Sequence, residues 1–183
     1  MKRIVITALL ICLCAAPLSA GLEFGIQVGA YSPTSGLEDN DNGIMLGADI
    51  WFKFAFFGIK AEGFYVDSSG QYTPSGLGDD FSGIQLEVDN IFSLDLMYFP
   101  VGGLFFLQGG LNHTNFDGDT LDELTQDNKL GYEVGLGVSL FEKLMVQGKL
   151  MYTPGAFEGN ALDSFDSLDS DVQGYMVSVA WHF

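Results

Sequence analysis

The feature that most constrains the fold is a two-residue alternation of apolar and polar side chains. In residues 22–30, LEFGIQVGA, every even position is apolar and every odd position is charged, polar or glycine. This period is typical of a β-strand with two unlike faces. It predicts eight strands, at residues 22–30, 44–52, 57–66, 84–98, 103–113, 130–140, 144–150 and 173–183.

The connections between these segments alternate in length. Three are short, at residues 53–56, 100–102 and 141–143, and four are long and polar, at residues 32–42, 67–82, 114–129 and 153–171. Short turns join antiparallel strands directly. We therefore predict one all-β domain, an eight-stranded antiparallel up-and-down barrel with short turns at one end and long loops at the other.

The alternation alone leaves open which face is outside. In water the apolar face would turn inward, as in a lipocalin-like barrel or a sandwich, whereas in a membrane it would turn outward. Most of the predicted strands are about 9–12 residues long, which suits a tilted membrane-spanning strand. Aromatic residues also gather at strand ends, where membrane interfaces favour them. Those near the short turns are Phe52, Phe54, Phe56, Phe57, Tyr98, Phe99, Phe105, Phe106, Phe141, Trp181 and Phe183, and those near the long loops are Tyr31, Tyr65, Tyr132, Tyr152 and Tyr175. We therefore predict a transmembrane barrel.

The last predicted strand carries apolar residues at every second position up to a final phenylalanine. These residues are Tyr175, Val177, Val179, Trp181 and Phe183. The pattern resembles the signal that the outer-membrane barrel assembly machinery reads. Residues 21–183 as a whole resemble the small eight-stranded outer-membrane barrels, such as the OmpA membrane domain and OmpX. The resemblance implies a Gram-negative-type outer membrane, with its lipids and the assembly machinery as partners and with both termini in the periplasm.

The first 20 residues have the pattern of a secretory signal peptide. A basic start, Lys2-Arg3, precedes an apolar run at residues 4–16 that is too short for a membrane helix. Small residues then predict cleavage after Ala20, so we expect a signal peptide at 1–20, a barrel domain at 21–183 and export through the periplasm. Both cysteines, Cys12 and Cys14, lie in the signal segment, which leaves no disulfide or thiolate metal site in the barrel.

The charge balance argues against a nucleic-acid partner. Without residues 1–20 the chain keeps five lysines, no arginine and all 24 acids, a formal charge of −19. Nucleic-acid binding needs lysine and arginine to displace phosphate counterions. We expect a monomer without a cofactor.

The polar face of the predicted strands would fill the barrel lumen. We expect a lumen polar cluster formed by Asp49, Lys60, Glu62, Glu87, Asp89, Glu133 and Lys149, with further inward residues Glu23, Gln27, Gln85, Asp95, Gln108 and Gln147. Inward glycines between them leave room for long side chains, because eight strands enclose little space. Lys60 and Lys149 are the only cations of the strand cores on this face, so we expect each to bridge several acids. The face fits either a polar plug or a narrow cation-preferring water path.

Clustered acids in the long loops offer hard oxygen ligands. Asp117, Asp119, Asp122 and Glu123 are the candidates for a Ca²⁺ site. Their spacing does not match an EF-hand loop. We favour solvated loop charge, with divalent cations lying between the loops and anionic lipid headgroups.

The evidence for catalysis is weak. Outer-membrane lipid A deacylases of similar size use a histidine with a serine two residues later, but here His113 is followed by Asn115. We therefore expect no enzyme. The favoured interpretation is a structural or interaction anchor with acidic extracellular loops. The alternative is a narrow, cation-preferring, porin-like channel, and a lipid-modifying outer-membrane enzyme ranks third.

Overall fold

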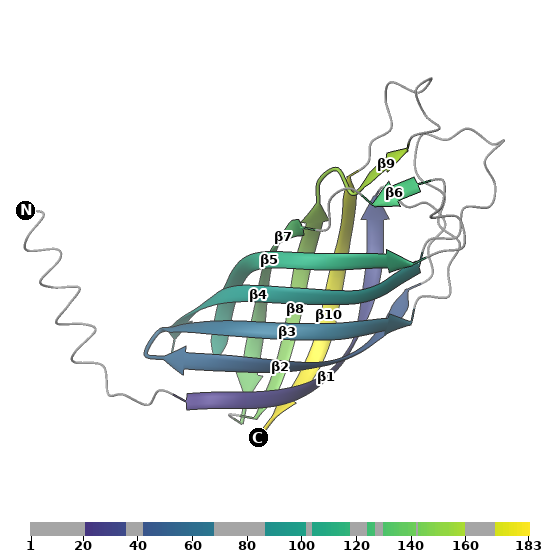
Figure 1. Cartoon of the computed structure of the whole chain (residues 1–183). Coiled ribbons are helices and arrows are strands. Elements are labelled where there is room, and N and C mark those ends of the chain that lie inside the picture. Colours follow the sequence, from purple (N-terminus) through teal and green to yellow (C-terminus); the bar gives the residue numbers. More distant parts are fainter. Residues whose placement is uncertain are drawn as a thin grey trace, which may run out of the picture.

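The protein folds as a closed eight-stranded β-barrel, which confirms the predicted fold class (Figure 1). The computed structural model describes residues 21–35, 42–67, 87–101, 104–117, 124–126, 130–141, 143–159 and 171–183. The predicted signal peptide and most of the predicted long loops lie outside these residues. In the described residues no helix is long and apolar enough to cross a membrane.

Every pair of neighbouring barrel strands is antiparallel, and the first strand pairs with the last. The order around the barrel is β1, β10, β8, β7, β5, β4, β3 and β2. The strands are β1 (Gly21–Ser35), β2 (Gly43–Phe54), β3 (Phe57–Asp67), β4 (Glu87–Val101), β5 (Phe105–Asp117), β7 (Leu130–Leu140), β8 (Leu144–Thr153) and β10 (Val172–His182). Because the sheet closes on itself, it has no free edge.

Several strands run further than the alternation predicted. β1 continues to Ser35 and β5 to Asp117, because pairing with Gln173 of β10 and Glu87 of β4 extends past the alternating segments. Two short strands were not predicted at all. β6 (Leu124–Gln126) and β9 (Phe157–Gly159) form a small separate sheet at the long-loop end of the barrel (Figure 1).

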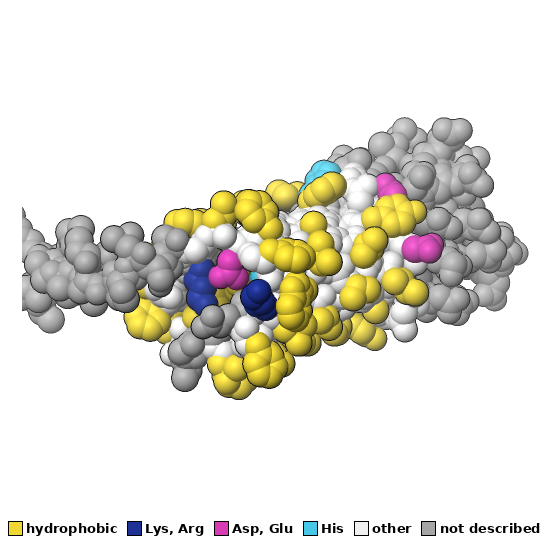
Figure 2. Space-filling view, turned by 90° about the horizontal axis from the view of Figure 1, so that it is seen from below, with side chains coloured by type: hydrophobic (Ala, Val, Ile, Leu, Met, Phe, Trp, Pro, Cys, Tyr) yellow, Lys and Arg dark blue, Asp and Glu magenta, His cyan; other side chains and the backbone are white. Residues whose placement is uncertain are grey.

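Most aliphatic side chains of the barrel strands point outward. Along β10, outward Val177 and Trp181 are about half exposed, whereas inward Met176 and Ser178 are buried. The same outward exposure holds in β1 for Leu22, Phe24, Ile26 and Val28. Figure 2 shows hydrophobic side chains spread over the wall of the barrel. Of the two orientations that the alternation left open, the chain therefore takes the one with the apolar face outside.

The inside of the barrel is stacked in three layers. A long-loop layer is mainly apolar and contains Tyr31, Met45, Phe64, Val66, Val88, Ile91, Met151, Ala156, Val172 and Met176. A short-turn layer contains Trp51, Met97, Phe99, Phe106, Met145 and Ala180. Between them, the middle layer holds buried polar and charged residues, among them Gln27, Lys60, Glu62, Asp95 and Lys149. The long-loop layer also includes three uncharged polar residues, Asn112, Thr114 and Thr153, which are buried and hydrogen-bonded.

Three residues of the predicted aromatic belts do not face the outside of the barrel. Tyr31, Phe99 and Phe106 point into the lumen and are at most 3% exposed. Position along the chain placed them correctly at strand ends, but the alternation assigns them to the inward face. The outward aromatic residues at the short-turn end include Phe52, Phe57 and Tyr98, whose rings lie in a row with Phe54.

Candidate functional site

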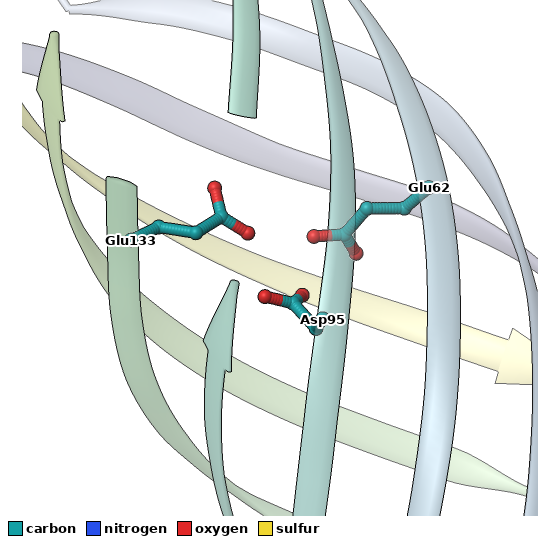
Figure 3. A group of neighbouring side chains, drawn as sticks. All are labelled: Glu62, Asp95 and Glu133. Carbon is teal, nitrogen blue, oxygen red and sulfur yellow. The ribbon is translucent and has the colours of Figure 1, made fainter. Parts of the chain in front are cut away.

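Five charged side chains meet in the middle layer of the lumen. Lys60 and Glu62 come from β3, Asp95 from β4, Glu133 from β7 and Lys149 from β8, and we refer to them as the lysine–carboxylate cluster. None of the five side chains has exposed surface. Figure 3 shows the three carboxyl groups directed toward one another from different strands. The two-residue alternation produces this arrangement, because it turns every second side chain of these strands inward.

Lys149 occupies the centre of the cluster. Its Nζ contacts a carboxylate oxygen of each of Glu62, Asp95 and Glu133. Lys60 lies to one side, with its Nζ 3.1 Å from Glu62 Oε2 and 3.6 Å from Asp95 Oδ2. Each lysine thus bridges several acids, as predicted from the sequence.

Three glutamines frame the charged groups. Gln27 Nε2 donates to Glu62 Oε2 over 3.0 Å, and Gln147 Nε2 lies 3.0 Å from the same oxygen. The Nζ of Lys60 donates to the side-chain oxygens of both Gln108 and Gln147. On the opposite side, Ser93 Oγ donates to Glu133 Oε2 over 2.9 Å. The amides therefore link β1, β3, β5 and β8 into one buried network.

Inward glycines create the space that the long side chains fill. A Cβ at Gly110 would lie 2.6 Å from Asp95 Oδ1 and 2.1 Å from a backbone oxygen. A Cβ at Gly135 would lie 2.9 Å from both Gln108 Nε2 and Lys149 Cγ. These distances are too short for any side chain, so each glycine leaves room for a polar side chain of the neighbouring strand.

The three carboxyl groups of the cluster could hold a cation, but the ammonium group of Lys149 already lies between them. One carboxylate oxygen each of Glu62, Asp95 and Glu133 lie within 4.8 Å of one another, a spacing that suits a bound cation. The Lys149 ammonium contacts all three groups and so provides the positive charge at that point. We therefore interpret the site as a buried ion-pair network.

The structure brings together only part of the predicted lumen cluster. Lys60, Glu62, Glu133 and Lys149 meet, and they are joined by Asp95, which was predicted to face inward. The inclusion of Asp89 is wrong. It is the extra residue of a bulge between Val88 and Asn90, and this register shift turns Val88 into the lumen instead. The side chain of Glu87 lies outside the described part.

Asp49 faces the lumen, as predicted, but belongs to a second site. Its Oδ1 lies 3.0 Å from Nε2 of His182, and the His182 ring stacks on Trp51 with ring centroids 4.8 Å apart. Trp51 Nε1 donates to Glu23 Oε2, and the Lys53 ammonium lies 4.6 Å from the centroid of the Phe99 ring. This Asp49–His182 site lies at the short-turn end of the lumen. His182 was missed as an inward partner, although its position between outward Trp181 and Phe183 indicated its direction.

The remaining predicted residues belong to neither of these two sites, or they lie outside the described part. Asp119, Asp122 and Glu123 are not among the described residues, and Asp117 ends β5 with its side chain undescribed. His113 lies on β5 opposite Phe92 and Leu130. The residues of the predicted assembly signal, Tyr175, Val177, Val179, Trp181 and Phe183, form one exposed outward row.

Comparisons with known proteins give similar barrels among solved structures. No protein-family model and no curated protein sequence matches the chain. The outer membrane protein OprG from Pseudomonas aeruginosa is 18% identical over 90% of this chain and 96% of its own, with a TM-score of 0.47. The outer membrane protein Ail of Yersinia pestis, in a phospholipid bilayer nanodisc, is 14% identical over 89% and 100%, with a TM-score of 0.47. Neisserial surface protein A is 8% identical over 88% and 94%, with a TM-score of 0.44. Likenesses this low say nothing about function, which has to be argued from the contacts of this chain.

Proposed function

We propose that the chain is an outer-membrane barrel with a closed lumen, which anchors its long-loop end at the cell surface. The observation that carries the proposal is a reversed distribution of side chains, with an apolar outer wall and charged groups buried in the lumen. Leu46, Leu136 and Leu150 are each more than 60% exposed, while Lys60 and Lys149 are buried. Water-soluble monomers rarely expose apolar patches of more than a few hundred Å².

The closed barrel supports a membrane location on a second ground. Hydrocarbon offers no hydrogen-bond partner to the backbone, so a spanning sheet has to satisfy its N–H and C=O groups internally. Here every barrel strand has two paired neighbours, including β1 with β10. Outer-membrane lipids would then be the main partners of the outer wall.

The packing inside favours an anchor over a channel. A water path would have to pass the long-loop layer and the short-turn layer, whose apolar members are at most 6% exposed. Between these layers the two lysines hold the carboxylates that would otherwise attract cations. An anchor needs no such path, and any partner contact would then fall to the acidic loops at the long-loop end.

The row of outward residues on β10 supports the proposed recognition by the barrel assembly machinery. Tyr175, Val177 and Val179 stand on the same face as Trp181 and Phe183 and are all exposed. A receptor could therefore read them together in an extended strand. We further propose that divalent cations lie between the acidic loops and anionic lipid headgroups, and that the barrel is a monomer.

The location is tested by expressing the full chain in a Gram-negative host and separating the membranes by density. We expect the protein in the outer-membrane fraction after a carbonate wash, with an unheated form that migrates faster on a gel than the heated form. Recovery in the soluble fraction with a folded sheet would contradict the proposal.

The closed lumen is tested by conductance of the purified, folded barrel in a planar bilayer. We expect no discrete current steps at neutral pH. Reproducible cation-selective steps would overturn the closed lumen and favour the channel, while leaving the membrane location intact.

A further inference from the structure

The lysine–carboxylate cluster has an excess of one negative charge in a place that excludes water. Two ammonium groups, of Lys60 and Lys149, face three carboxyl groups, of Glu62, Asp95 and Glu133. All five side chains are fully buried. An uncompensated charge in such a setting is strongly unfavourable. Something must therefore neutralise it.

The other groups that face the cluster cannot do so. They are the uncharged side chains of Gln27 on β1, Ser93 on β4, Gln108 on β5, Gln147 on β8 and Ser178 on β10. From β2 the nearest inward titratable group is Asp49, an acid that is already paired with His182 toward the short turns. Among the described residues the cluster thus has no third cation.

We propose that the cluster is a binding site for one proton, shared between Asp95 and Glu133. Glu62 is the carboxylate that stays ionised, because both lysines and the amides of Gln27 and Gln147 contact it. Asp95 and Glu133 have fewer such contacts with cations and hydrogen-bond donors. Asp95 Oδ1 is buried with neither a hydrogen bond nor an ion-pair contact, whereas Glu62 Oε1, which also lacks a hydrogen bond, contacts the Lys149 ammonium. Glu133 accepts from Ser93 and Lys149.

A proton fits this site better than a metal ion does. The ammonium of Lys149 already contacts all three carboxyl groups, so a second cation would meet it at close range. The described apolar residues of the layers on both sides are at most 6% exposed, which disfavours the entry of a hydrated ion. A proton can be taken up while the barrel closes, on carboxyl groups that are still in water.

The site makes folding depend on pH in a definite direction. The folded barrel holds one proton more than the unfolded chain, so its stability falls as pH rises. The unfolding equilibrium constant should rise by up to tenfold per pH unit above about pH 6, where the carboxyl groups of the unfolded chain are ionised and its lysines are protonated. The slope ends where the folded cluster releases its proton.

Infrared spectroscopy of the wild-type barrel in lipid vesicles tests the proposal directly. The inference rests on the proposed membrane location, so folding into the vesicles is first confirmed by the heat-dependent gel shift. At pH 8 we expect the carbonyl band of a neutral carboxyl group. Absence of this band from the folded wild type would overturn the inference alone, whereas failure to enter vesicles would count against the proposed function.

Two variants locate the proton and one serves as a control. Glu133→Gln and Asp95→Asn each leave two ammonium groups with two carboxylates, so both should lose the band and the pH slope. Glu23→Gln removes a carboxyl group that hydrogen-bonds Trp51 at the short-turn end and should keep both. A band that survives in both cluster variants would contradict the assignment. A stability that depends on Na⁺ at fixed pH, and not on pH itself, would show a bound cation in place of the proton.

Discussion

The two faces of the barrel strands obey different rules, although they alternate along the same chain. The outward face is occupied mainly by exposed apolar side chains of Leu, Ile, Val and Phe, which form no ion pairs. The inward face depends on particular pairs, such as Lys149 with Asp95 or His182 with Asp49, drawn from strands far apart in sequence. The comparison shows that the surrounding solvent determines which side chains the outer face accepts. Shape and charge complementarity determine which side chains the inner face accepts. A substitution should therefore be tolerated outside if it stays apolar, and inside only if it keeps its partners.

The largest effect should come from removing the central cation of the inner face. Lys149→Met leaves Lys60 alone against three carboxyl groups, and breaking a buried ion pair costs about 3–5 kcal/mol. Urea unfolding in lipid vesicles measures the loss. The matched control is Lys143→Met in the exposed turn before β8, which should stay within about 0.5 kcal/mol of wild type. Similar losses for the two variants would mean that the buried pairs contribute little.

A charge on the outer face should be the next most damaging change. Val134 lies at mid-strand in β7 and is 60% exposed on the outward face. Val134→Arg would place a charge in the bilayer centre and should lower the free energy of unfolding by about 2–4 kcal/mol. The apolar exchange Val134→Leu should be nearly neutral. If Val134→Arg folded as well as wild type while fully inserted, the assignment of the lipid-facing side would be wrong.

Replacing a glycine by alanine should lower stability on the inward face and leave it unchanged on the outward face. A Cβ at inward Gly137 would lie 2.3 Å from Phe106 Cζ and 2.5 Å from a backbone oxygen, whereas a Cβ at Gly148 has nothing closer than 3.9 Å. Gly137→Ala should cost about 1–3 kcal/mol through overpacking. Gly148→Ala should change stability by less than about 0.5 kcal/mol. Equal effects in the same unfolding assay would show that the lumen repacks freely.

The smallest effect concerns a carboxylate outside the lumen. The Tyr152 hydroxyl donates to Asp171 at the long-loop end, and the Gly155 N–H donates over 2.8 Å, and these bonds hold the pKa of Asp171 below its usual value. A lowered pKa stabilises the fold above the unfolded value, and this contribution is lost as pH falls through the folded value. Tyr152→Phe should raise the pKa of Asp171, which NMR titration of the carboxyl carbon would follow. An unchanged pKa would mean that the Tyr152 bond is unimportant.

The difference between the faces also explains what the sequence could predict. The strands, the short turns and the apolar wall follow from local alternation, so the turn at residues 55–56 lies within its predicted range. The inward direction of Asp95 and Gln147 could be predicted from the same alternation. Their partners could not, because which inward residues meet depends on strand register around a closed sheet. The bulge at Asp89 shows where prediction from alternation fails. One extra residue exchanges the inward and outward faces of β4, although the sequence continues to alternate.

The polar network of the lumen crosses the junction between the first and last barrel strands. Ser178 of β10 donates to Gln27 of β1, which lies 151 positions earlier, and Gln147 Nε2 reaches both side chains. Pairing of such distant segments is a slow step in folding. Until it occurs, Gln27 and Ser178 lack each other as partners, whereas the Lys60–Asp95 and Lys149–Glu133 pairs join neighbouring strands and do not depend on it. The side-chain hydrogen bonds across this junction therefore exist only in the closed barrel.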